Sequence, residues 1–246
     1  PAGEVFVELC ERVTRDVRET KDRISDMESE ASARISVGST QGLFSHFYQG
    51  WARQEGLAER LQLNLKATNW VGEQFLDALD SGECDLVLCY WHEDLPWKDH
   101  LSEDRYEWVT LAREFLVPVS VADENGQPRF ALPGTPEQPV PLIAYHSRGF
   151  LQSAIEGHLN RCKLPANLLP LNENTQSAGI KALVKQGFGM GWLPQRMTEK
   201  SERFGSLTRA GDKRCDVPLE IRLIRLREPR SDDLLTLWKT LENKHV

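Results

Sequence analysis

The sequence predicts an α/β protein in which two similar lobes are joined by two crossing segments. Three observations favour this fold. Strand-like and helix-like patterns alternate along the chain, as they do where helices cover a parallel sheet. The alternating series occurs twice, on either side of a proline-rich loop at 123–139. One further strand at 218–226 and a helix at 232–244 follow the second series, and we expect them to return to the first lobe.

The first thirty residues, 1–30, predict one long amphipathic helix. Between Glu4 and Met27 there is no proline or glycine. Apolar residues form a stripe at helical spacing, at Val5, Leu9, Val13, Val17, Ile24 and Met27. A second copy of the chain is an expected partner for this stripe, although packing on its own domain stays open. Because the chain begins at Pro1 and not at methionine, we expect further residues upstream.

The two series are read from changes of hydrophobic period. In the first, the predicted elements are strand 35–37, helix 43–54, strand 61–65, helix 70–80 and strand 84–89. Residues 105–121 predict two strands joined by a short turn at 112–114. In the second series, the predicted elements are strand 141–145, helix 149–162, strand 168–171, helix 175–186 and strand 188–193.

A binding loop is predicted where the first strand meets the first helix. The period changes from two to about 3.6 between Gly38 and Gly42. In open α/β sheets ligands bind in the crevice at the carboxyl ends of strands, where free N–H groups and the helix dipole converge. Ser39, Thr40 and Gln41 are therefore candidate ligand contacts. A role of Ser39 or Thr40 as a helix cap alone stays open.

The other strand ends supply the remaining candidates. The third strand runs into Tyr90 and Trp91, which we expect to face the same crevice. In the second series, polar residues follow the strands at four positions that predict the opposing wall: Ser147, Arg148, Asn174 and Thr175. Arg148 is the expected partner of a carboxylate, because a guanidinium matches two oxygens, unless it is solvated or paired with a nearby acid. Trp192 is a further candidate wall, with core packing as its alternative.

Composition narrows the function classes. Arg plus Lys (30) against Asp plus Glu (37) gives a net charge of −7, so this chain has no cationic excess for holding nucleic acid. The five scattered cysteines indicate neither a disulfide framework nor a zinc site and fit a cytoplasmic protein. No export signal, membrane span or enzyme fingerprint is present. His92, Glu93 and Asp94 are adjacent, and we expect them to point apart and to hold no metal.

Five features together resemble the effector-binding half of LysR-type transcriptional regulators. They are Pro1-Ala-Gly before a long helix, Arg34-Ile-Ser-Val-Gly-Ser-Thr40, Ser81-Gly-Glu-Cys-Asp-Leu-Val-Leu88, Phe115-Leu-Val-Pro-Val119 and Val184-Lys-Gln-Gly-Phe-Gly-Met-Gly-Trp-Leu-Pro194. The resemblance implies two Rossmann-like lobes of the type 2 periplasmic-binding-protein fold after a linker helix. Lobe I would comprise 33–114 plus 218–246, and lobe II 115–217.

The same resemblance implies partners. A winged helix-turn-helix would precede this chain and bind DNA. The linker helix would pair chains into dimers or tetramers, a small polar or anionic effector would bind between the lobes without a cofactor, and RNA polymerase would be a further partner. A periplasmic solute-binding protein, which shares the fold, is the alternative, but it would lack the linker helix.

Within that family, three short segments resemble regulators that respond to hypochlorous acid: His92-Glu-Asp-Leu95, Ala122-Asp-Glu-Asn-Gly126 and Gly191-Trp-Leu-Pro194. Methionine oxidation is the sensing step that this resemblance implies. The chain departs from the pattern at two positions where methionines are expected, since it has Phe150 and Gln176. Met190 is the remaining redox candidate, with core packing as its alternative.

Overall fold

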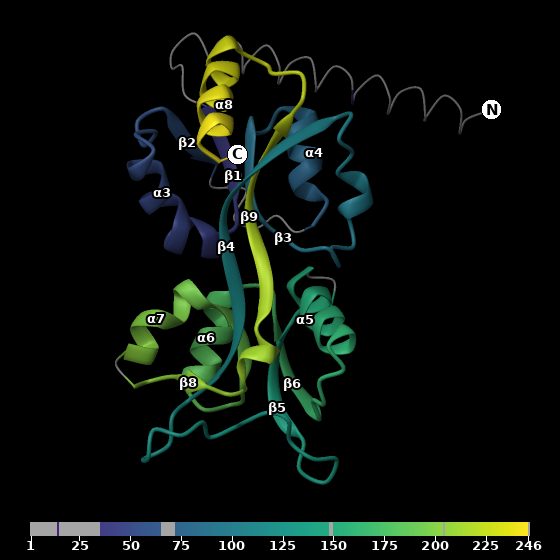
Figure 1. Ribbon diagram of the computed structural model, residues 1–246, viewed down its shortest axis with the longest axis vertical. Helices are drawn as coiled ribbons and strands as arrows, with labels where there is room; N and C mark the ends of the chain where they lie inside the picture. Colours follow the sequence, from purple (N-terminus) through teal and green to yellow (C-terminus); the bar gives the residue numbers. More distant parts are fainter. Residues whose placement is uncertain (1–13, 15–34, 65–71, 148–149, 204, 246) are drawn as a thin grey trace, which may run out of the picture.

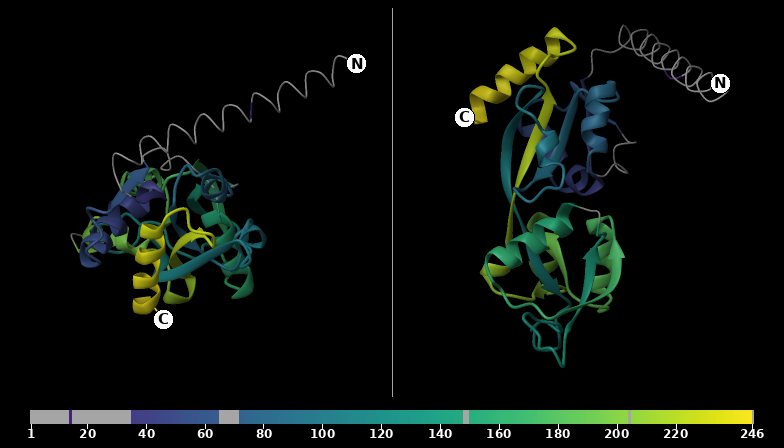
Figure 2. Two further views of the ribbon diagram at one scale, coloured as in Figure 1. Left: turned by 90° about the horizontal axis from the view of Figure 1, so that it is seen from above. Right: turned by 90° about the vertical axis from the view of Figure 1, so that its right-hand side faces the viewer.

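The computed structural model describes residues 14, 35–64, 72–147, 150–203 and 205–245 (Figure 1). The predicted helix 1–30, apart from Thr14, and the candidate Arg148 lie outside the described residues. Two α/β bodies lie one above the other along the long axis, and two long strands run between them (Figures 1 and 2). We call the upper body lobe I and the lower body lobe II. None of the described helices combines the length and apolarity needed to cross a membrane.

Lobe I is built on three parallel strands in the order β2–β1–β3. Their bounds are β1 Ile35–Ser39, β2 Leu61–Asn64 and β3 Leu86–Trp91. The helical elements are α2 Gln41–Leu43, the π-helix η1 Phe44–Tyr48, α3 Gln49–Gln54, α4 Gln74–Ser81, the 3-10 helix η3 Lys98–His100 and α8 Asp232–His245. Leu86 to Tyr90 are all buried because helices cover both faces of the sheet. Gly82 ends α4 in the left-handed conformation, as its position after a helical run predicts.

The two crossing strands are β4 Tyr106–Ser120 and β9 Val217–Leu226, and residues 106–116 of β4 pair antiparallel with β9. The predicted turn at 112–114 is wrong, because β4 runs through it with only a register shift between Thr110 and Ala112. The charged pair that suggested a turn is accommodated in the strand. Arg113 is exposed, and the buried Glu114 carboxylate pairs with Arg196, whose Nε lies 3.1 Å from Glu114 Oε2.

Lobe II contains the parallel pair β5 Val140–Tyr145 and β6 Leu168–Asn174. Its other elements are α5 Phe150–Arg161, α6 Ser177–Lys185, β7 Gly191–Pro194, α7 Gln195–Arg203, β8 Thr208–Arg209 and the 3-10 helix η4 Lys213–Cys215. Strands β7 and β8 both pair with β4, so one seven-stranded sheet extends from lobe I into lobe II. Because β4 and β9 cross without a break, the predicted lobe limits at 114/115 and 217/218 remain a prediction.

The Gly-Met-Gly segment before β7 has a packing role. The N–H of Met190 donates to Pro141 O at 2.8 Å, and Met190 O accepts from Ile143 N–H at 2.8 Å. A Cβ at Gly189 would lie 2.7 Å from Pro141 O, and one at Gly191 would lie 2.7 Å from Ile180 Cγ2. The glycines therefore let the backbone approach β5 and α6 more closely than any other residue would allow.

Candidate functional site

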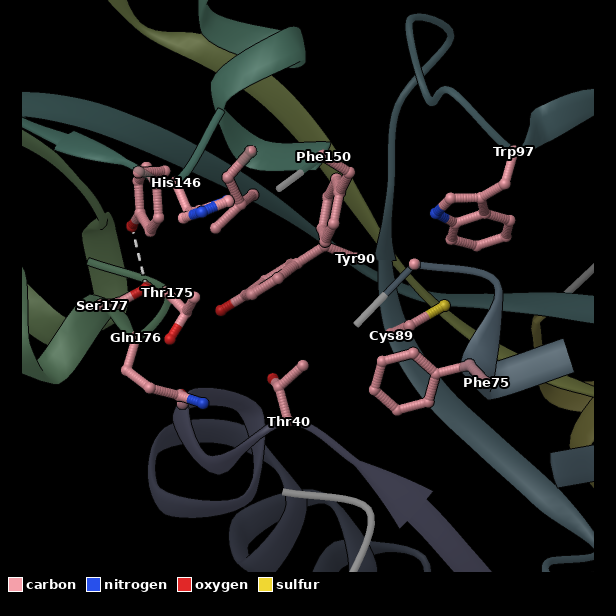
Figure 3. Close-up of a pocket in the computed structure, with 14 residues that line it drawn as sticks. Thr40, Phe75, Cys89, Tyr90, Trp97, His146, Phe150, Thr175, Gln176 and Ser177 are labelled. Carbon is pink, nitrogen blue, oxygen red and sulfur yellow. Dashed lines mark hydrogen bonds between the residues drawn. The ribbon is translucent and has the colours of Figure 1, made fainter. Parts of the chain in front are cut away.

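A cavity of about 280 Å³ lies where the two lobes meet. The carboxyl ends of β1 and β3 approach it from lobe I, and those of β5 and β6 approach it from lobe II, as expected for ligand sites in α/β folds. Its walls are Thr40, Gly42, Gly72, Phe75, Cys89, Tyr90, Trp97, Tyr145, His146, Phe150, Leu151, Thr175, Gln176 and Ser177. Figure 3 shows ten of these residues with labels.

Aromatic rings bridge the two lobes at the centre of the cavity. Tyr90 of β3 and Phe150 at the start of α5 lie with ring centroids 6.4 Å apart and planes tilted by 44°. On the lobe II side, the Tyr145 hydroxyl is hydrogen-bonded to Ser177 Oγ at 2.8 Å. Thr40 lines the cavity from lobe I and also caps α2, since its Oγ1 accepts from Leu43 N–H at 3.4 Å. The two predicted roles of Thr40 are thus compatible.

The cavity has one polar and one apolar end. In Figure 3, His146, Thr175, Gln176 and Ser177 lie on one side of the Tyr90 ring. Phe75, Cys89 and Trp97 lie on the other side. Among the described lining residues there is no carboxylate, lysine or arginine. Such a cavity suits a small molecule with an apolar body and a polar group at one end.

Burial favours the neutral form of three titratable groups in the cavity wall, Cys89, Tyr90 and Tyr145. Burial raises the pKa of the Cys89 thiol to about 12, so it is not a nucleophile. Burial also raises the pKa of Tyr90 well above its ordinary value, and burial raises that of Tyr145. These groups can hold and orient a ligand through hydrogen bonds and packing, and their protonation states do not suit acid–base chemistry.

Three of the ten predicted contacts line this cavity: Thr40, Tyr90 and Thr175. Ser39 is fully buried behind it, and Gln41 and Ser147 are solvent-exposed. Asn174 instead organises the turn into α6, because its Oδ1 accepts from Gln176 N–H at 2.8 Å. The assignment of Ser39, Gln41, Ser147, Asn174 and Arg148 as ligand contacts stays a prediction.

The two predicted tryptophan walls and Met190 lie elsewhere. Trp91 faces a separate cavity of about 320 Å³ beside the crossing strands, and its ring is covered by the Arg222 guanidinium at 3.6 Å. Trp192 is 1% exposed, and its Nε1 donates to Cys215 O at 2.9 Å. Met190 is fully buried in the core. For Trp192 and Met190 these positions favour the alternative of core packing.

Most of the apolar wall was not predicted from the sequence. Phe75 and Leu151 lie in the first turns of α4 and α5, where an apolar residue is expected to pack in the core. Trp97 follows an irregular segment with no periodic signal. Phe150 and Gln176 carried a usable signal, because the resemblance to hypochlorite-responsive regulators had already marked both positions. Both line the cavity.

A second contact between the lobes lies beside the cavity. The Arg161 guanidinium at the end of α5 reaches Glu93 Oε1 at 2.6 Å and Asp94 Oδ2 at 3.1 Å in the segment after β3. We call these three residues the interlobe clasp. A Cβ at Gly157 would lie 2.7 Å from Asp94 Cγ, so a side chain at position 157 would displace the Asp94 carboxylate. The donor atoms of His92, Glu93 and Asp94 lie within 4.8 Å of one another, which corrects the expectation that they point apart.

The clasp should restrain lobe opening while adding little to global stability, because the pair is partly exposed. We expect Arg161→Gln to broaden the distribution of distances between spin labels at Glu59 and Glu124, measured on labelled chain diluted into unlabelled chain. Arg105→Gln, which removes a pair within lobe I of similar exposure, is the control. Equal distributions in both variants would show that the clasp does not restrain the lobes.

The fold and cavity define a two-lobed small-molecule-binding domain. The family model described as the LysR substrate binding domain matches residues 28–245, and the chain belongs to this family. The two-lobed α/β fold is the one that this resemblance implied, and the implied linker helix lies outside the described residues apart from Thr14.

Individual relatives and solved structures share only about a fifth of their residues with this chain. The HTH-type transcriptional regulator YjiE of Escherichia coli is 22% identical over 175 residues, which are 71% of this chain and 54% of YjiE. The chain thus spans about half the length of that relative. The regulatory domain of HypT from Salmonella typhimurium has a TM-score of 0.71 at 20% identity, covering 86% of this chain and 95% of that domain. DarR of Vibrio fischeri in complex with DNA has a TM-score of 0.72 at 19% identity, covering 99% and 79%.

Proposed function

We propose that this chain is the effector-sensing part of a DNA-binding transcriptional regulator and that its effector binds in the cavity between the lobes. The observation that carries the proposal is that residues of both lobes wall one cavity, with Tyr90 and Phe150 in contact across it. A ligand that contacts both rings has a different affinity for open and closed lobes. This difference is what a ligand needs in order to shift a conformational equilibrium.

The two ends of the cavity support a more specific ligand class. The polar end offers hydroxyls and one amide from Thr40, Thr175 and Gln176, and the opposite end is aromatic. We propose a small ring compound with a polar group, held with that group in lobe II. If the polar group is a carboxylate, Arg148 remains its proposed partner.

Self-association and DNA binding belong to the same proposal. Leu169 and Leu171 are 47% and 51% exposed on β6, which pairs only with β5 among the described strands. An apolar edge strand of this kind supports contact with a second copy. DNA would be bound by a domain upstream, since this chain has a net charge of −7, and RNA polymerase would be contacted on promoter DNA in the cytoplasm.

Native mass spectrometry of the chain tests the proposed function. We expect a dimer or tetramer that retains a small molecule from expression or takes one up from a panel of aromatic and alicyclic acids and ketones. A monomer that takes up no compound from the panel would contradict both the effector site and the self-association.

Direct oxidation is the second candidate, and it is favoured by the likeness to HypT, which is described as a hypochlorite-specific LysR-type regulator. Met190 is 0% exposed and Met197 is 4% exposed, so both sulfurs are shielded in the folded chain. We therefore expect one equivalent of hypochlorite to leave Met190 unmodified in peptide mass maps of folded protein. Oxidation of Met190 with retained fold and an altered oligomer would instead support redox sensing.

A further inference from the structure

One buried polar group in the cavity wall has no hydrogen-bond partner among the residues that the structure describes. The Trp97 side chain is 3% exposed, and its Nε1 lacks a hydrogen-bond acceptor within the described residues. A buried N–H without an acceptor is costly, and native proteins rarely leave one without a functional reason. In Figure 3 the indole nitrogen lies on the ring edge that faces Tyr90 and Cys89, toward the interior of the cavity.

The amino end of helix α4 lies near this N–H and also favours a hydrogen-bond acceptor. Gly72 and Phe75, at the amino end of α4, line the same end of the cavity. Among the described residues no side chain caps α4 at Glu73. The amino end of a helix carries partial positive charge from its first N–H groups. Gly72 packs against the indole, since an added Cβ there would lie 3.5 Å from Trp97 Cδ1 and 3.8 Å from Trp97 Nε1.

The acceptor that fits this end is an uncharged one. Phe75, Cys89 and Trp97 surround it, and the described lining holds no lysine or arginine to neutralise an anion. Burying a carboxylate here would cost more than one indole hydrogen bond returns, whereas a carbonyl oxygen loses little on leaving water. A ring that carries a carbonyl satisfies both the aromatic wall and the indole N–H.

We propose that Trp97 forms a specificity subsite in lobe I that accepts a neutral carbonyl oxygen, so that the effector is a cyclic ketone, lactone or quinone. This inference rests on the proposed function and narrows its ligand class. The ligand then spans the cavity, with its carbonyl on Trp97 and any second polar group at the Thr40 and Thr175 end.

The test compares 1-indanone with indane, which has the same ring system without the oxygen. We expect the ratio of the dissociation constant of indane to that of 1-indanone to fall about five- to tenfold in Trp97→Phe relative to the unaltered chain. Trp51→Phe is the matched control, because Trp51 Nε1 is also buried without an acceptor in the described part of the chain but does not line the cavity. The ratio should be unchanged there.

A second readout is the NMR shift of an indole N–H signal in the unaltered chain. Of the seven tryptophan indole N–H signals, one should move downfield in the unaltered chain with 1-indanone and not with indane. Its absence from Trp97→Phe, or from Trp97→Tyr if the first variant does not fold, assigns it.

Two results would overturn the inference. In the first, the ratio of the two dissociation constants is equal in Trp97→Phe and the unaltered chain, and no indole signal shifts. The Trp97 subsite would then be wrong, while binding of indane would still support an effector site in the cavity. In the second, the chain binds neither indane nor 1-indanone at millimolar concentration, which also contradicts the Trp97 subsite. If no compound of the acid and ketone panel binds either, the proposed effector site is contradicted as well.

Discussion

Thr175→Trp should abolish effector binding while leaving the fold intact. Thr175 is exposed and lines the polar end of the cavity, so a larger side chain meets no core atoms there. An indole at this position would occupy part of the 280 Å³ into which the ligand fits. We expect the dissociation constant of a ligand identified by native mass spectrometry to rise by about 100-fold or more, which corresponds to roughly 2.7 kcal/mol.

The control for that variant is Thr236→Trp, which adds the same side chain at an exposed position on α8. Both variants should melt within about 2 °C of the unaltered chain, since surface substitutions change stability little. Isothermal titration calorimetry separates the outcomes. Binding that is unchanged in Thr175→Trp would place the ligand outside this cavity.

Trp192→Ala should be among the most destabilising single substitutions. The side chain is 1% exposed in the core of lobe II, and its Nε1 donates a hydrogen bond to the carbonyl oxygen of Cys215. Truncation leaves a large void and removes a buried hydrogen bond, which together cost about 3–5 kcal/mol. For a domain of this size the melting temperature should fall by roughly 10 °C or more in a calorimetric scan.

Trp192→Phe separates the packing role from a ligand role. It keeps most of the volume and loses the donor, so we expect a loss of about 1–3 kcal/mol. Ligand affinity in the folded fraction should be unchanged, because Trp192 does not line the cavity between Tyr90 and Phe150. A selective loss of affinity with normal stability would contradict the placement of Trp192 in the core.

The spacing of apolar residues along the chain predicted most of the fold. The strands β1, β3, β5 and β9 and the helices α4, α5, α6 and α8 each bury a face that the sequence pattern marks. The period failed at residues 112–114, where a buried Glu114 reads as a surface residue until its partner Arg196 is known. It also missed α7, whose residues are almost all polar.

The site was less predictable than the fold. Residues at strand ends could be identified because parallel strands converge on one edge, and Thr40, Tyr90 and Thr175 follow this rule. The rule cannot tell which side of the sheet a side chain faces, so adjacent Tyr90 and Trp91 enter different cavities. Nor can it place Trp97, which reaches the cavity through tertiary packing alone.

The most direct test is a crystal structure of this chain with a ligand selected by the mass-spectrometry panel. We predict ligand density in the cavity against Tyr90 and Phe150, with an acceptor atom within about 3 Å of Trp97 Nε1. Ligand density in the cavity beside Trp91 and Phe115, with the cavity lined by Tyr90 and Phe150 empty, would contradict this prediction.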